Sequence, residues 1–116
     1  MHVINHTSLP REQRDGCDCQ TVAGHALGGP FEVQMLQLAP GAATPPRRHA
    51  AARVVLVLAG SGKQRLEGAP QSFQAPCTVQ VPGGAEHQII NSGLTPLQLV
   101  VIAVSPERAA AAASPP

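Results

Sequence analysis

Four side chains in the middle of the sequence are of types that bind ions or carry protons. His49 stands just before an apolar run, and His87 follows another apolar run and a Pro-Gly-Gly turn. Arg47 and Arg53 flank the first histidine. Imidazole nitrogens bind metals or exchange protons, whereas planar guanidinium groups suit carboxylates and phosphates. We expect these four side chains to converge inside a small β-barrel.

Short strands must position these residues, because the composition disfavours helices. Twelve prolines and eleven glycines among 116 residues divide the chain into short segments. Hydrophobic residues make up 43% of the chain, which suffices for the core of a single domain without disulfides or metals. Only 2% of the residues are aromatic, so Val, Leu and Ile must build that core.

Alternating or continuous apolar segments between turn signals predict eight to ten strands, hence an all-β sandwich or barrel. The run 53–59 is apolar after its first residue and predicts a strand buried on both faces or nearly so. We expect an N-terminal arm over 1–19 with a short edge strand at Val3 and Ile4, a barrel over 20–105 and a flexible tail over 106–116. The strand candidates are 20–23, 31–38, 53–59, 63–67, 71–74, 78–81, 87–90 and 96–105.

Charge and hydropathy exclude several classes of partner. The net charge is +1 and charged residues make up 13% of the chain, so neither nucleic acid nor a membrane surface is an expected partner. No leader sequence and no apolar run of membrane-spanning length is found. Three cysteines, two of them one residue apart, form a poor disulfide framework. These features predict a cytoplasmic protein.

Cys17, Cys19 and His25 lie near one another in the sequence. A soft-metal site is one interpretation, but structural zinc needs four ligands and no second cysteine pair lies nearby. We favour the plainer interpretation of two thiols and a histidine on a loop or edge. Cys77 is expected to pack as a small hydrophobic residue.

The segment 82–91 resembles the second motif of the cupin family, which reads Gly, five residues, Pro-x-Gly, two residues, His, three residues, Asn. Pro82, Gly84, His87 and Asn91 match the Pro-to-Asn part in full, and Pro76 stands where the motif has its leading glycine. The resemblance implies a small single-domain cupin of the conserved-barrel type. Its fold would be a double-stranded β-helix, also called a jelly-roll barrel. Because many small cupins are homodimers, we expect a homodimer here.

The first cupin motif reads Gly, five residues, His-x-His, three or four residues, Glu, six residues, Gly. Gly41, His49 and Gly60 keep its spacing. Arg47 stands where the motif has its first histidine, and Arg53 stands where it has glutamate. The resemblance therefore implies a degenerate metal site that keeps two of four ligands.

Arginine cannot deprotonate in proteins and so cannot ligate a metal. A guanidinium a few Å away would repel a divalent ion by on the order of several kcal/mol, even at an effective dielectric constant near 20. Three arrangements remain open. Arg47 and Arg53 point inward and form an anion site with both histidines. Alternatively they swing to the rim and leave His49 and His87 to hold a metal weakly, or the pocket is a relic.

Three functions correspond to these arrangements. The first is binding or sensing of a small anionic ligand at Arg47, His49, Arg53 and His87, without a cofactor. The second is a metal-dependent enzyme of oxygenase or isomerase type, with a divalent transition metal on the two histidines. The third is a structural or regulatory homodimer without a small ligand.

Purely structural roles are also open for several of these residues. His49 and His87 could be hydrogen-bonded core or pocket histidines, and Arg53 could pair with Glu86 or Glu67. Asn91 is expected to be a turn or cap residue.

Overall fold

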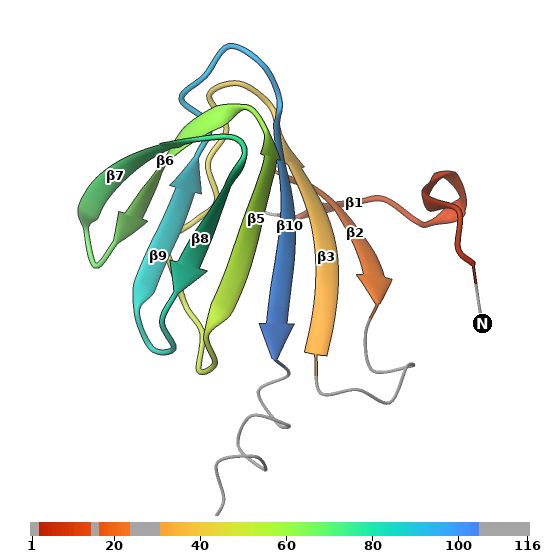
Figure 1. Cartoon of the computed structure of the whole chain (residues 1–116), viewed down its shortest axis with the longest axis horizontal. Coiled ribbons are helices and arrows are strands. Elements are labelled where there is room, and N and C mark those ends of the chain that lie inside the picture. The colour runs from red at the N-terminus through yellow and green to blue at the C-terminus, as the bar shows by residue number, and fades with distance from the viewer. Residues whose placement is uncertain (1–2, 15–16, 24–30, 105–116) are drawn as a thin grey trace, which may run out of the picture.

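The computed structural model describes residues 3–14, 17–23 and 31–104 as an all-β barrel of two antiparallel sheets (Figure 1). These residues contain ten strands and a single turn of 3-10 helix, η1 (His6–Ser8). The six-stranded sheet has the order β1 (Glu12–Arg14), β2 (Cys17–Ala23), β3 (Phe31–Leu38), β10 (Leu97–Val104), β5 (Arg53–Ala59), β8 (Cys77–Val81). The four-stranded sheet has the order β4 (Arg47–Arg48), β9 (Glu86–Ile90), β6 (Ser61–Leu66), β7 (Ala69–Gln74). The predicted double-stranded β-helix is confirmed.

The core lies between the two sheets and is aliphatic, as the composition predicts. Val55 and Val57 of β5 face it, and they pair with Val101 and Leu99 of β10 in one unbroken stretch of register. Both sheets contribute buried side chains to it; the core residues are Cys17, Leu38, Val55, Val57, Val79, Val81, Ile89, Leu97, Leu99 and Val101. No helix in the described part of the chain has the length and apolar character needed to cross a membrane.

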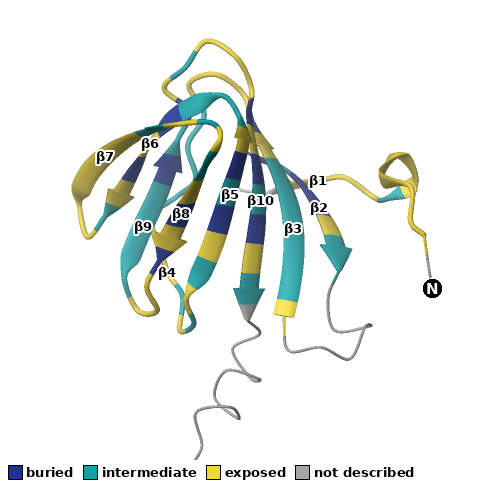
Figure 2. Cartoon of the chain, viewed as in Figure 1, coloured by how far each residue is buried: buried dark blue, intermediate teal, exposed yellow. Residues whose placement is uncertain are grey.

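Strand β5 is buried on one face only, so the expectation of burial on both faces is wrong. Val54 and Leu58 are 37% and 52% exposed, whereas Val55 and Val57 are almost fully buried. Figure 2 shows the resulting bands of buried and exposed residues along β5 and β10. Consecutive strand residues point to opposite faces. The apolar run therefore supplies both a core face and an apolar outer face.

The N-terminal segment differs from its predicted organisation. Val3 and Ile4 form no strand, and the edge strand is β1 instead, which pairs with β2. Strand β2 begins at Cys17 rather than Gln20, because Cys17 and Cys19 alternate with Asp18 and turn inward, where both are buried. The expected loop or edge position of the two thiols is therefore wrong. His25 and the tail over 106–116 lie outside the described residues.

Asn91 is a turn residue, as expected, and its buried side chain also links two segments of the chain. Its side chain is fully buried, and Nδ2 donates to the carbonyl oxygens of Leu38 and Thr95 at 3.0 and 2.9 Å. Its Oδ1 accepts from the backbone N–H of Gly93 at 2.9 Å. Buried polar groups are stable when hydrogen-bonded in this way. The last residue of the second cupin motif thus fastens the end of β3 to the loop before β10.

Candidate functional site

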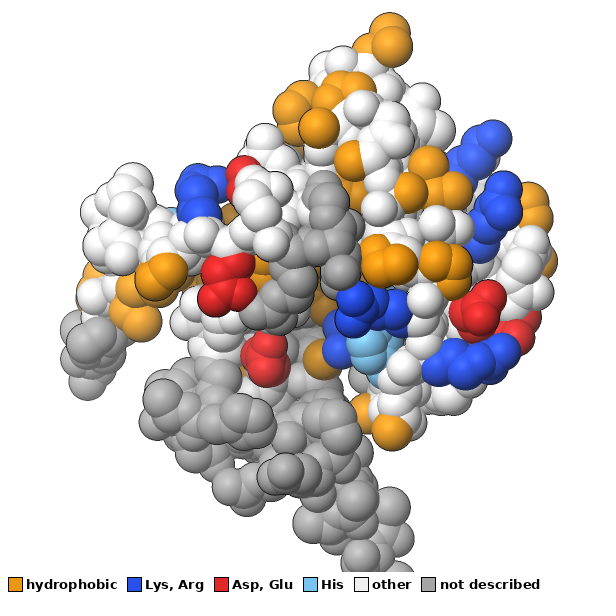
Figure 3. Space-filling model, turned by 180° about the vertical axis from the view of Figure 1, so that it is seen from behind, with side chains coloured by type: hydrophobic (Ala, Val, Ile, Leu, Met, Phe, Trp, Pro, Cys, Tyr) orange, Lys and Arg blue, Asp and Glu red, His pale blue; other side chains and the backbone are white. Residues whose placement is uncertain are grey.

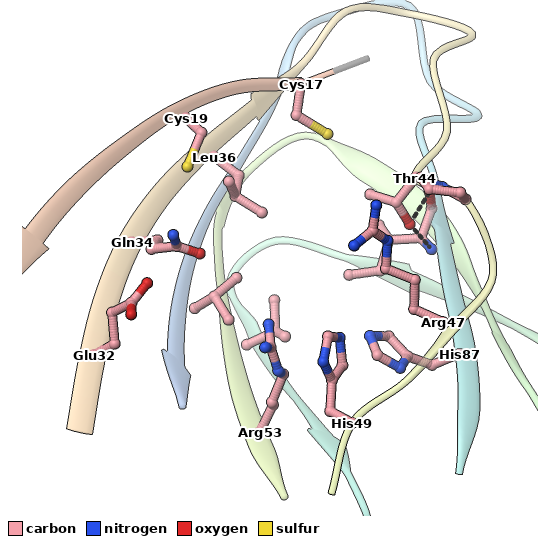
Figure 4. A pocket seen from close by; sticks show the side chains of 14 residues that line it. Cys17, Cys19, Glu32, Gln34, Leu36, Thr44, Arg47, His49, Arg53 and His87 are labelled. Carbon is pink, nitrogen blue, oxygen red and sulfur yellow. Dashed lines mark hydrogen bonds between the residues drawn. The ribbon is translucent and has the colours of Figure 1, made fainter. Parts of the chain in front are cut away.

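A cavity of about 200 Å³ opens between the two sheets. Figure 4 shows imidazole, guanidinium, carboxylate and thiol groups facing the same space. On the side of the molecule turned away in Figure 1, histidine and basic side chains lie next to one another (Figure 3). The lining residues are Cys17, Cys19, Glu32, Gln34, Leu36, Thr44, Pro45, Arg47, His49, Arg53, Val55, His87, Ile89 and Val101.

Strands β4 and β9 bring the first arginine to the second histidine. Arg47 is the register partner of His87, so the two residues share the face that lines the cavity. The next residue, Arg48, points to the opposite face, as strand geometry requires. There its guanidinium donates to the carboxylate of Glu67 at 2.8 Å. Only the first of these two consecutive arginines therefore belongs to the site.

The glycines between β8 and β9 hold the two histidines together. Gly84 has a φ of +80°, and its N–H donates to the carbonyl oxygen of His49 at 2.7 Å. A Cβ on Gly83 would lie 2.6 Å from the carbonyl oxygen of Ala50, so the two backbones can approach this closely only at glycine. The imidazole centroids of His49 and His87 are consequently 5.0 Å apart, with ring planes inclined at 45°.

Both imidazoles are held in the neutral form. Burial lowers the pKa of His49 to about 4, with further lowering by Arg53, His87 and Arg47. Burial also lowers the pKa of His87, assisted by Arg53 and partly opposed by backbone groups of Ala85 and Arg47. The buried Nδ1 of His87 has no hydrogen-bond partner within the described residues. The pocket thus presents neutral imidazoles next to fixed positive charge.

Glu32 lines the cavity although it belongs to neither motif. Glu32 on β3 and Arg53 on β5 are both register partners of Ala103, which lies on β10 between them. Burial lowers the pKa of the Arg53 guanidinium, and the carboxylate of Glu32 partly offsets this by raising that pKa. Cys17 and Cys19 also line the cavity. Motif spacing cannot reveal these residues, because their strands precede the motifs and meet the site only through sheet pairing.

The suggested pairing of Arg53 with Glu67 or Glu86 is wrong. The carboxylate of Glu67 accepts from Arg48 and from the backbone N–H of Glu86 at 2.7 Å. Among the described residues, neither glutamate forms an ion pair with Arg53. Arg53 lines the cavity instead, half-buried, and Arg47 lies at the same cavity with its side chain exposed.

The donor groups of this cavity do not fit a metal centre of the usual cupin type. Three or four neutral or anionic ligands are needed for a divalent transition metal. In the ranges that the structure describes, no three His, Cys, Asp or Glu side chains are grouped to hold a metal ion. His49 and His87 are the two imidazoles available, and Arg47 and Arg53 add positive charge beside them.

Comparison with known proteins agrees with this architecture. Residues 34–103 match the family model described as a cupin domain. Auxin-binding protein 1 of Arabidopsis thaliana is 38% identical over 117 residues, an alignment that covers 90% of this chain and 59% of that protein. This chain therefore spans less than two thirds of that relative's length.

Two solved structures resemble the fold. A predicted oxalate decarboxylase from Thermotoga maritima superimposes with a TM-score of 0.80 at 18% identity, covering 90% of this chain and 99% of that one. A cupin 2 domain-containing protein from Halorhodospira halophila gives a TM-score of 0.72 at 28% identity, with coverage of 81% and 67%. With the family match over more than half of its length, the chain belongs to the cupin family.

Proposed function

We propose that this cupin binds a small organic anion in the cavity between its two sheets. The observation that carries the proposal is the cavity lining, in which Arg47 and Arg53 lie beside His49 and His87. A guanidinium fork binds a carboxylate through two parallel charge-assisted hydrogen bonds. The imidazoles add donors or acceptors, and Nδ1 of His87 has no partner in the described structure.

The size of the cavity and one relative support this proposal. A volume of about 200 Å³ lies below the usual range for ligand pockets, so the ligand would be small. The Arabidopsis relative is, by its name, a binding protein for auxin. This precedent favours ligand binding as a role for the barrel.

The test is isothermal titration calorimetry of the purified protein against acetate, butyrate, hexanoate, succinate and inorganic phosphate. The double variant Arg47→Ala, Arg53→Ala should lose affinity by about 100-fold or more, since each charge-assisted hydrogen bond contributes about 1.5–3 kcal/mol. Arg65→Ala is the matched control, because Arg65 is exposed on β6 and does not line the cavity. If none of these anions binds, or the double variant binds as well as the parent, the proposal fails.

A metal-dependent enzyme remains the alternative, supported by the closeness of His49 and His87. Elemental analysis of the purified protein decides between the two. A stoichiometric transition metal that is lost in the variant His49→Ala, His87→Ala would establish a metal site and overturn the metal-free anion site.

The outer face of the six-stranded sheet supports a second proposal, which is self-association. Its register rows are apolar: Val33, Ile102 and Val54 in one, Met35, Val100 and Leu56 in the next. These side chains carry no charge, so two identical faces could meet without repulsion. The two rows continue onto β8 as the uncharged Gln80 and Thr78, so that four strands span an area of about 500 Å². A pair would therefore bury about 1,000 Å² in total, the lower limit for a stable interface.

Light scattering after size exclusion tests this second proposal. The parent protein should be a homodimer, and Val54→Lys with Ile102→Lys should make it a monomer. Ser72→Lys is the control, because Ser72 is exposed on β7 of the other sheet. A monomeric parent protein, or a dimer that survives both lysines, would contradict the proposal.

A further inference from the structure

The cavity is lined by one acidic residue, Glu32, as well as by Arg47 and Arg53. Glu32, Ala103 and Arg53 form one row across β3, β10 and β5. Neighbouring strands lie about 4.8 Å apart, so the Cα atoms of Glu32 and Arg53 are about 10 Å apart. The side chain of Ala103 between them is a single methyl group, and both Glu32 and Arg53 line the cavity. A long acidic and a long basic side chain can therefore both reach the same ligand-binding space, as Figure 4 shows.

This arrangement sets the charge of the ligand that fits. Arg47, Arg53 and Glu32 are the charged residues of the cavity lining, and the two imidazoles are neutral at pH 7. Two guanidinium groups and one carboxylate leave a single net positive charge. A ligand with one negative charge neutralises the site. A second negative charge would lie close to Glu32 in a partly buried space, where repulsion is poorly screened.

The wall becomes apolar away from the charged row. The next row toward the interior is Gln34, Val101 and Val55, and Leu36 lies beyond it on β3. Figure 4 shows Cys17, Cys19 and Leu36 at the end of the cavity opposite to Arg53 and Glu32. Thiols and aliphatic side chains offer dispersion contacts and few hydrogen bonds. This end suits a hydrocarbon body better than a second polar group.

We propose that the cavity selects small monocarboxylic acids with an apolar body, and that Glu32 is the residue that excludes dicarboxylates and phosphate. The carboxylate would lie between Arg47 and Arg53, and the apolar body would extend along Val55 and Val101 toward Leu36. This inference rests on the anion binding proposed above, and it adds the class of ligand and a specificity-determining residue.

The test measures affinities for butyrate, hexanoate, succinate and phosphate in the parent protein and in Glu32→Gln. The parent should prefer hexanoate to butyrate, and both to the two polyvalent anions. Glu32→Gln should raise affinity for succinate and phosphate roughly tenfold more than for butyrate, because it removes one charge–charge repulsion at several Å. Glu12→Gln is the control, since Glu12 is exposed on β1 and does not line the cavity. Circular dichroism checks that each variant is folded.

A second substitution tests the apolar end by itself. Leu36→Asn places an amide at the far end of the cavity, where Leu36 is only partly buried, so it should weaken hexanoate several-fold and leave acetate, which is too short to reach this end, unchanged. The outcomes separate the two proposals. If no anion binds the parent protein, anion binding and this inference both fail. If anions bind but Glu32→Gln does not change the ratio of succinate to butyrate affinity, the specificity assigned to Glu32 is overturned and anion binding stands.

Discussion

Strands β3, β10 and β5 present two faces of contrasting chemistry. The inner face carries Glu32 and Arg53 at one end and the hydrophobic core at the other, whereas the outer face has rows of uncharged apolar side chains. Proteins usually place charges outside and apolar groups inside. The departure is informative at both surfaces. The charged groups in the cavity are the basis for the proposed ionic ligand, and the exposed apolar sheet face is the basis for the proposed self-association.

The largest expected difference between the two faces is in packing energy. Leu99→Ala removes a side chain that is 1% exposed on the inner face, so we expect the free energy of unfolding to fall by about 2–5 kcal/mol. Leu58→Ala removes one that is 52% exposed on the outer face, and less than about 1 kcal/mol should be lost. Urea denaturation monitored by circular dichroism measures both.

The same two variants also test whether the outer face of the sheet is covered by a partner in solution. A loss at Leu58 that matches the loss at Leu99 and depends on protein concentration would show that the outer face is covered in solution. Equal losses at all concentrations would contradict the distinction between an inner and an outer face.

The next effect compares a polar side chain that is hydrogen-bonded inside the barrel with one that is exposed on its surface. Asn91→Ala should cost about 1–3 kcal/mol of stability, because the carbonyl oxygens of Leu38 and Thr95 lose their amide donor. Gln74→Ala, at an exposed position on β7, is the control and should change stability by less than about 0.5 kcal/mol. Thermal unfolding gives both values. An Asn91→Ala variant as stable as Gln74→Ala would show that the hydrogen bonds of Asn91 do not stabilise the fold.

The last comparison is the pH dependence of stability, which depends on the imidazoles being held neutral in the folded state. The pKa of His49 is about 4 in the folded state against 6.5 in the unfolded state, so the unfolded chain binds more protons between these values. Stability should therefore be fully present above pH 6.5 and decline as pH falls toward 4. The melting temperature of His49→Gln should decline less over this interval. An identical decline in both proteins would show that His49 is not held neutral.

An anion in the pocket should reduce that pH dependence. Negative charge beside an imidazole raises its pKa, so ligand binding would be coupled to proton uptake. Butyrate stays ionised at pH 6, and its affinity should be higher there than at pH 8. His49→Gln with His87→Gln should remove this difference.

The short strands and the two motifs could be predicted from sequence, because local patterns encode them. Alternation, proline and glycine mark strands and turns, and Pro82, Gly84, His87 and Asn91 keep a fixed spacing around one turn. The convergence of Arg47, Arg53, His49 and His87 could also be predicted, since all four lie in or beside that pair of motifs. Their charges favoured an anion site but left a weakly bound metal and a pocket without a ligand as alternatives, and the anion site stays a proposal.

Sheet pairing decided what local patterns could not. Glu32 lies in the same row of the sheet as Arg53, because Ala103 on the strand between them is in register with both. Along the chain, 20 residues lie between Glu32 and Arg53. The side of each strand that faces the core was likewise undetermined for 53–59, where every residue after Arg53 is apolar. Residue types thus determined the barrel and placed two arginines beside the two motif histidines. Long-range register depends on the packing of the whole sheet. It places the carboxylate of Glu32 and the thiols of Cys17 and Cys19 at the cavity, and it decides which apolar side chains lie on the outer face.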